Sequence, residues 1–266
     1  MRVLTLLLLL IPAAVRAAEV MPQLQVGTVI ELERRGSGHI QGIATDGRHI
    51  YWAITRTLFK SDWNGKVLAE CKGRIHFGGP CWAFSKLYVP VCGSGFNKNL
   101  TLAKSKNFVH VYDENLKLEK VYELPEQIFG IGGMAFHDGR FFVVGGRPKG
   151  MPGNTVYEYD AEFHLLKKHE LDFNSSKGIQ TITRAWGRWY LGCYGLSGNA
   201  SIELDDDFRL LRRVRPRTAF GALPLNEPDT FLVAFMQKKE GQKTSVTIAR
   251  VCKVYDVSQG ERGKKY

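Results

Sequence analysis

The chain has 266 residues, and its 37 lysines and arginines outnumber its 26 aspartates and glutamates, which gives a formal net charge of +11. The basic residues are dispersed and no recognition helix is evident, so we exclude nucleic-acid binding as the reason for this charge. A basic protein favours anionic glycans, polymers or membrane surfaces, or is simply kept in solution, and charge does not specify a fold.

Residues 1–17 have the pattern of a secretory signal peptide. Arg2 precedes a leucine run at 6–10, and small residues follow up to Ala17, after which we expect cleavage. The apolar run is too short to span a bilayer and no later run is long enough, so no transmembrane segment is predicted. Loss of Arg2 and Arg16 lowers the net charge from +11 to +9. We expect a secreted or periplasmic, soluble monomer.

A repeated motif divides the rest of the chain. Four times a strand-like run ends in an aspartate, and five residues later an aliphatic residue follows a Lys, His or Arg. The copies lie 51, 47 and 45 residues apart, at 62–67, 113–118, 160–165 and 205–210. A fixed period of this length with short strands indicates a repeat architecture, and four strands per unit indicate a β-propeller.

Each repeat begins with an inner strand of small residues, turns at a polar or glycine pair, and continues with a bulky apolar strand. The first repeat reads His39 to Ala44, a turn at Asp46-Gly47, and His49 to Ala53. Glycines are expected on inner strands because these strands converge at the central axis. The inner and second strands of the other repeats are predicted at 76–84 and 86–91, 130–136 and 141–144, 178–183 and 188–192, and 220–225 and 230–235.

A third strand follows in every repeat, and a fourth follows the aspartate turn in the first four. The fifth repeat lacks that turn. Residues 26–33 alternate in polarity and have no repeat of their own, so we predict that they close the last blade and remove an exposed sheet edge. The predicted fold is therefore an all-β, five-bladed β-propeller over residues 18–254, followed by a mobile basic tail at 255–266. Third strands are predicted at 57–60, 108–112, 155–159, 201–204 and 245–251.

The run from Thr45 to Gly65 contains an apolar Tyr51-Trp52 strand, a short hairpin and a closing Asp-x-x-Gly turn. It resembles the blades of the YWTD and NHL-type propellers. The resemblance covers the blade framework along the chain and implies architecture, not an activity, because these motifs form the blade and not a site. Those families typically have six blades, whereas five are counted here.

Five cysteines lie in the predicted mature chain, so in an oxidising compartment at least one thiol stays free. No C-x-x-C spacing occurs, which disfavours a zinc ribbon or thioredoxin-type centre. Cys71 and Cys81 flank the first blade boundary and are the predicted pair. The sequence also has three glycosylation acceptors, Asn99, Asn174 and Asn199. The cysteines are Cys71, Cys81, Cys92, Cys193 and Cys252.

Aligned inner strands predict a site at one mouth of the channel. His39 and His76 occupy equivalent positions of adjacent blades, two residues ahead of the level that holds Gln41 and Gln180. Neutral imidazoles and amides there would hydrogen-bond a polar ligand or hold a divalent metal. The alternative is that both histidines satisfy backbone groups where the strands begin. No carboxylate accompanies them, so no metal and no other cofactor is predicted.

Loops between second and third strands form the same face in propellers. Glycine-rich loops in the second, third and fourth blades let backbone amides face a ligand. Arg147, Lys149, Lys177 and Arg217 are predicted to add positive charge there, and Arg147 and Lys177 are assigned to the site. The alternative for each is a solvated loop cation.

An enzyme reading lacks the expected groups. Glycoside-hydrolysing propellers need two carboxylates, but the inner strands here contain no Asp or Glu. Only Glu123, Glu126 and Asp172 lie in connections at the predicted ligand mouth. No Gly-x-Ser-x-Gly elbow occurs, and Cys92 or Cys193 beside His76 is the remaining nucleophile candidate.

The sequence therefore predicts an exported propeller that binds a polar small molecule or glycan at one mouth of its channel, with no catalytic residue assigned. Two alternatives stay open. One is a glycan-active hydrolase or lyase that uses an acid from the loops. The other is a protein-interaction scaffold that needs no pocket.

Overall fold

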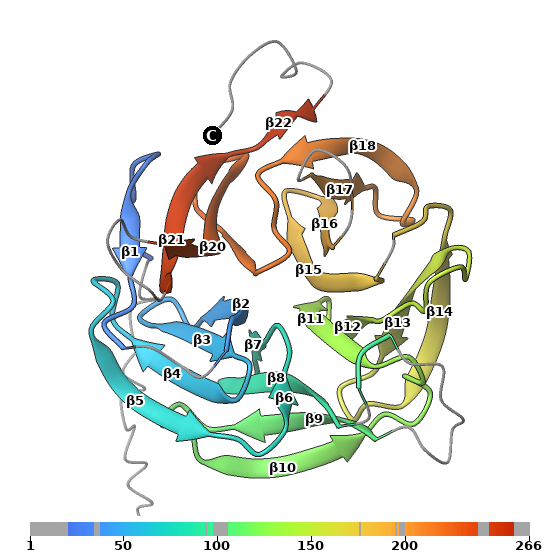
Figure 1. Cartoon of the computed structure of the whole chain (residues 1–266), viewed down its shortest axis with the longest axis horizontal. Helices are drawn as coiled ribbons and strands as arrows, with labels where there is room; N and C mark the ends of the chain where they lie inside the picture. The colour runs from blue at the N-terminus through green and yellow to red at the C-terminus, as the bar shows by residue number, and fades with distance from the viewer. Residues whose placement is uncertain are drawn as a thin grey trace, which may run out of the picture.

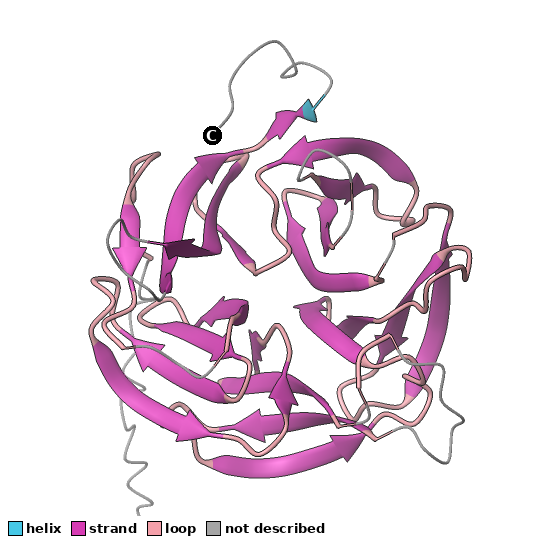
Figure 2. Cartoon of the chain, viewed as in Figure 1, coloured by secondary structure: helices cyan, strands magenta, loops and turns pink. Residues whose placement is uncertain are grey.

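The computed structural model describes residues 21–34, 38–93, 95–97, 106–175, 177–194, 196, 200–238 and 245–257. They form five antiparallel β-sheets arranged as a ring around one axis (Figure 1). Figure 2 shows that strands and their connecting loops make up nearly all of the described chain. The predicted all-β, five-bladed propeller is confirmed. No helix among the described residues has the length and hydropathy needed to cross a membrane.

The first blade shows how the sequence makes a sheet. Its strands pair in order from the axis outward. The hairpin between the first two strands is fixed by Asp46, whose Oδ1 accepts hydrogen bonds from the backbone N–H of Arg48 at 2.8 Å and of His49 at 2.7 Å. The middle strands are buried, while the outermost alternates between half-buried and exposed residues. These strands are β2 (Ile40–Thr45), β3 (Ile50–Ile54), β4 (Thr57–Ser61) and β5 (Val67–Lys72).

The next three blades repeat this order. In the second blade the inner strand is split into two short strands, which both pair with the next strand. The strands are β6 (His76–Phe77), β7 (Cys81–Ala83), β8 (Lys86–Cys92), β9 (Asn107–Tyr112) and β10 (Leu118–Glu123); β11 (Ile131–His137), β12 (Arg140–Gly145), β13 (Asn154–Tyr159) and β14 (Leu165–Leu171); and β15 (Ile179–Ala185), β16 (Arg188–Cys193), β17 (Ser201–Leu204) and β18 (Leu210–Arg215).

The repeated aspartates lie in the predicted turns between third and fourth strands, and their side chains cap these turns. Asp113 Oδ1 accepts from the N–H of Asn115 at 2.9 Å and of Lys117 at 2.8 Å. The third residue after each aspartate has positive φ, which glycine adopts freely and other residues adopt at a cost. In the last three copies that residue is a leucine or phenylalanine, and burial of its side chain offsets the cost. The equivalent bonds form at Asp62, Asp160 and Asp205.

The fifth blade is closed by the amino-terminal strand, as predicted. This blade contains β19 (Ala222–Pro224), β20 (Thr230–Lys238) and β21 (Ser245–Lys253). Strand β1 (Val29–Glu31), shorter than the predicted 26–33, pairs antiparallel with β21 and buries Ile30. The backbone N–H of Glu33 then bonds the carbonyl of Gly65 at 2.9 Å, so the same segment also joins the first blade.

The predicted tail begins with ordered residues. Tyr255 and Asp256 form β22, which pairs antiparallel with Val214 and Arg215 on the outer strand β18 (Figure 1). The expectation of a mobile tail from residue 255 is therefore wrong for these two residues, because the edge of β18 offers them backbone partners. Residues 258–266 lie outside the described part of the chain.

The apolar core lies between blades and not in a single centre. Each of five clusters of buried side chains joins two neighbouring blades. Between the second and third blades, for example, Phe141 and Phe163 stack with ring centroids 4.5 Å apart, and Tyr88 packs on Phe141 at 4.6 Å. This sheet-on-sheet packing leaves the inner strands free to approach one another at the axis.

All five cysteines are free thiols, so the predicted pair of Cys71 and Cys81 is wrong. The reason is radial position. Cys71 lies on β5, the outermost strand of the first blade, whereas Cys81 lies on β7 at the inner edge of the second. Residues that are close in sequence across a blade boundary therefore lie on opposite edges of their blades, one at the periphery and one at the axis.

Candidate functional site

The histidine mouth, as we call the end of the axis where the inner strands begin, is marked by His39, Gln41, His76 and Gln180. The rings of His39 and His76 lie 6.5 Å apart, centroid to centroid, with their planes at 63°. The prediction that two histidines of adjacent blades meet is confirmed. Their proximity follows from the repeat, because equivalent positions of neighbouring blades lie at the same height on the axis.

Both histidines are biased towards the neutral form. Burial lowers the pKa of His39 below its ordinary value. Burial also lowers the pKa of His76, the nearby His39 and Arg56 lower it further, and an interaction of the ring with its own backbone opposes this shift without reversing it. Every charge that shifts this group is positive. The mouth therefore presents neutral imidazoles at physiological pH, each with one acceptor nitrogen, and that of His39 accepts from Nε2 of Gln41.

The two glutamines occupy bulges in their inner strands. The pairing of β2 with β3 skips from Ile40 to Gly42, and that of β15 with β16 skips from Ile179 to Thr181. A bulge of this kind re-aims one side chain. Gln41 is 4% exposed, and its Nε2 lies 2.8 Å from Nε2 of His39, so it is tied into the histidine pair.

Two buried polar atoms at this mouth have no hydrogen-bond partner among the described residues. They are Nδ1 of His76 and Nε2 of Gln180, a side chain that is 7% exposed. A buried polar group without a partner costs about 1–3 kcal/mol, so such atoms normally meet water or a ligand. A hydrogen bond from a ligand to either atom would therefore contribute most to its binding free energy.

Aromatic residues from the fourth and fifth blades border the histidines. Phe220 packs edge-on against His39 with centroids 6.4 Å apart, and Tyr194 lies 5.8 Å from Phe220. The guanidinium carbon of Arg217 lies 5.2 Å from the centroid of each of these two rings. Tyr194 and Phe220 were not assigned to the site from sequence, although Phe220 starts the predicted inner strand of the fifth blade and Tyr194 follows β16. Both positions belong to this end of the blade.

Arg147 and Lys177 are not brought to the histidines by any contact among the described residues. The Arg147 guanidinium donates to the carbonyl of Pro152, with Nε at 3.0 Å, and lies 5.8 Å from the ring of Phe129. The Arg147 side chain therefore stabilises its own loop, between β12 and β13. Lys177 is exposed in the turn before β15, and Lys149 is exposed in the Arg147 loop. These assignments stay predictions.

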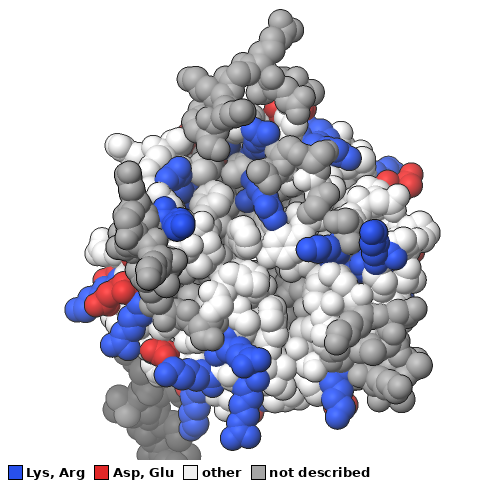
Figure 3. Space-filling model, viewed as in Figure 1, with Lys and Arg blue, Asp and Glu red and all other residues white. Residues whose placement is uncertain are grey.

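Figure 3 shows one face of the ring, on which lysine and arginine side chains are spread around the periphery and the middle is uncharged. The described residues contain no cluster of three or more His, Cys, Asp or Glu that would hold a metal ion. Cys193 is buried, and burial raises its pKa to about 12, so its thiol stays protonated and is a poor nucleophile. Asn174 accepts from the N–H of Gly153 at 2.7 Å, while Asn99 and Asn199 lie outside the described residues.

Neither a protein-family model nor a curated protein sequence matches the chain. Solved structures do. A glutaminyl cyclase from Myxococcus xanthus is 12% identical, with a TM-score of 0.56, and the match covers 87% of this chain and 97% of that one. A luciferin-regenerating enzyme is also 12% identical, with a TM-score of 0.51 and coverages of 85% and 95%. At this identity the likeness establishes the propeller fold, and these two neighbours are propeller enzymes.

Proposed function

We propose that this protein binds a hydroxyl-rich small molecule, of the carbohydrate class, at the histidine mouth. The observation that supports the proposal is the pair of buried, unpartnered polar atoms, His76 Nδ1 and Gln180 Nε2. A hydroxyl group both donates and accepts, so it can match an imidazole nitrogen and an amide nitrogen in one ligand. Such a ligand replaces the water that these atoms would otherwise need.

The aromatic residues support the same class of ligand. Tyr194 and Phe220 offer apolar ring surface beside the polar atoms, and sugar rings have both polar edges and apolar faces. His39 and Gln41 already bond each other and hold one wall of the mouth. In this proposal Arg147 and Lys177 act from the outer loops, where their charge steers a ligand and does not fix its orientation.

The proposal places the protein outside the cytoplasm, because residues 1–17 have the pattern of a signal peptide. The alternative of an enzyme is favoured by one observation, which is that two propellers of similar fold are enzymes by name. One observation argues against an enzyme. The charged groups that shift the pKa of His76 are His39 and Arg56, and neither is a carboxylate that could act as a general acid.

The test is isothermal titration calorimetry of the full chain against a panel of neutral mono- and oligosaccharides, with uronic acids for comparison. We expect saturable binding of a neutral sugar that is lost in the double variant His39→Gln, His76→Gln. His110→Gln is the matched control, because His110 is also half-buried but bonds Tyr112 on the third strand of the second blade. The proposal is wrong if no sugar binds, or if the double variant folds and binds as tightly as the wild type.

A further inference from the structure

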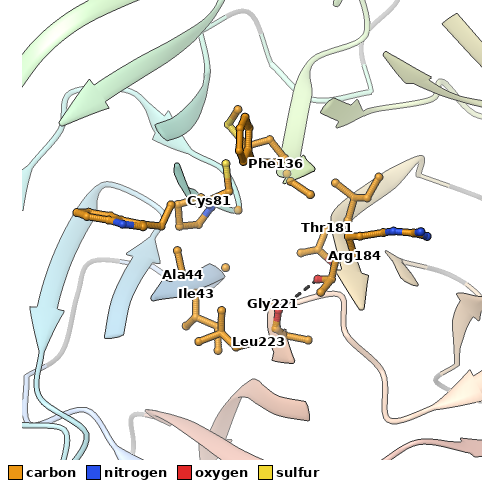
Figure 4. Close-up of a pocket in the computed structure, with 18 of the residues that line it drawn as sticks. Ile43, Ala44, Cys81, Phe136, Thr181, Arg184, Gly221 and Leu223 are labelled. Atoms are coloured by element: carbon orange, nitrogen blue, oxygen red, sulfur yellow. Dashed lines mark hydrogen bonds between the residues drawn. The ribbon is translucent and has the colours of Figure 1, made fainter. Parts of the chain in front are cut away.

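A second cavity lies at the other end of the axis, where the inner strands end and turn into hairpins. It has a volume of about 230 Å³, and each blade contributes four consecutive residues to its wall (Figure 4). The first three residues of each set are buried, and the last is half-exposed. The cavity therefore opens at the hairpin end. The half-exposed rim consists of Thr45, Trp82, Phe136, Arg184 and Pro224.

The axis is narrow at the inner end of this cavity, where a Cβ on Gly79 of the second blade would lie 3.6 Å from Cγ2 of Thr181 in the fourth blade, and neighbouring inner strands approach one another closely. A Cβ on Gly42 would lie 2.4 Å from Cα of Gly79, and one on Gly221 would lie 2.7 Å from Cα of Gly42. Gly79 and Gly133 form a parallel bridge between the second and third blades. Only glycine permits this approach. This narrow glycine level lies between the cavity and the histidine mouth, and we call the cavity the blind chamber.

The wall of this blind chamber is largely apolar. Ile43, Met134, Ile182 and Leu223 supply aliphatic surface from four blades. The hydroxyls of Thr181 and Thr183 are engaged by the carbonyls of Thr218 at 2.8 Å and Ala222 at 3.2 Å. These two hydroxyls therefore already donate their hydrogen bonds to the backbone.

Arg184 is the one charged residue among the lining residues, and its charge is directed elsewhere. Its guanidinium pairs with Asp206 through Nη2 and lies 5.0 Å from the ring of Trp189, while its Nη1 is buried without a hydrogen-bond partner among the described residues. Figure 4 shows the side chain extending away from the centre of the cavity, so neither nitrogen faces a ligand inside it. Burial raises the pKa of the Cys81 thiol, which keeps that group neutral. A charged ligand would lose its hydration here without gaining a partner.

We propose that the blind chamber binds an uncharged small molecule with an apolar body of one or two rings. An apolar cavity of about 150 Å³ is large enough to bind benzene, so a chamber of this size accommodates a bicyclic compound such as indole. The narrow inner end limits the length of the ligand, and the half-exposed Trp82 and Phe136 contact it as it enters. This inference rests on the cavity and not on the histidine mouth, so either can fail without the other.

The experiment is titration of the full chain with indole and, as its charged counterpart, indole-3-carboxylate, followed by methyl NMR. Ile43, Ile182 and Met134 methyl signals should shift with indole, whereas Met236, outside the lining of the chamber, should not. We expect indole to bind at least about tenfold more tightly than the carboxylate. Absence of saturable shifts at the chamber methyls, or equal affinity for both compounds, would overturn the proposal.

A variant adds a second test. Cys81→Leu enlarges a side chain that lines the chamber and also packs in the core between the second and third blades, and it should weaken indole at least about tenfold. Cys71→Leu, on the outer strand of the first blade, should leave the affinity unchanged. Circular dichroism and melting establish whether each variant is folded. A folded Cys81→Leu protein with wild-type affinity for indole contradicts the proposal, and if that variant does not fold, the methyl shifts of the wild type decide.

Discussion

The two ends of the propeller axis are built by the same five inner strands, yet they differ in chemistry. At the histidine mouth, bulges and strand starts present imidazoles and amides, two of whose buried atoms lack partners among the described residues. In the blind chamber the hydroxyls of Thr181 and Thr183 are bonded to backbone carbonyls, and the Arg184 side chain pairs with Asp206 and extends away from the centre of the cavity. The comparison shows that in a propeller the polarity of a mouth is set by a few side chains, while backbone geometry alone separates the two ends.

The largest expected effect is the loss of both binding sites when the ring is opened. Deleting residues 18–33 removes β1, whose Ile30 is buried together with Leu32, and exposes the edge of β21. Burial of two such side chains contributes about 3–6 kcal/mol, so we expect a much lower melting temperature, aggregation through the free edge and loss of both sugar and indole binding. Calorimetry and light scattering measure this. Unchanged melting after the deletion would refute closure of the ring by the amino-terminal strand.

A change of pH should separate the two ends. Acidification from about pH 7.5 to about pH 5 protonates the histidines, and a protonated imidazole no longer accepts a hydrogen bond. Because the pKa values of His39 and His76 are lowered, most of the loss of sugar affinity should come below the ordinary value of about 6.5. Indole affinity should stay constant, since no chamber side chain titrates in this range. Equal weakening of both ligands, measured by calorimetry, would mean that acid unfolds the protein and does not act on one mouth.

Most of the framework could be predicted from the sequence, for physical reasons. An aspartate that caps its own turn is a local signal, so Asp113 and its equivalents predict the fourth strand of each of the first four blades. The His39–His76 pair followed from alignment of the repeats. Radial and loop geometry could not be predicted, which is why Cys71 with Cys81 and the start of the tail at Tyr255 were assigned wrongly. The blind chamber could not be predicted, because its alanines, leucines and isoleucines have the same sequence pattern as any buried strand.

A turn aspartate should alter stability while leaving both ends intact. Asp113→Ala removes two hydrogen bonds to backbone N–H groups. We expect a loss of about 0.5–2 kcal/mol in the free energy of unfolding, as for other local caps, with unchanged affinity for sugar and indole. Urea denaturation measures the first and calorimetry the second. Reduced sugar affinity at unchanged stability would place this turn at the histidine mouth and reverse the assigned direction of the blades.

The smallest effect tests the coupling inside the histidine mouth. His39 contributes to the lowered pKa of His76, after burial, because two imidazolium ions 6.5 Å apart repel each other. His39→Gln should therefore raise the pKa of His76 part of the way back, since burial and Arg56 still act on it. Because a buried neutral histidine takes up its proton more readily in the unfolded chain, stability should fall as the pH drops below about 6.5, and less steeply in the variant. NMR titration of the imidazole signals measures the shift, with His110 as the reference in the same molecule. A pKa of His76 that does not move would show that the two rings are neighbours without electrostatic coupling, and would leave burial as the main cause of its shift.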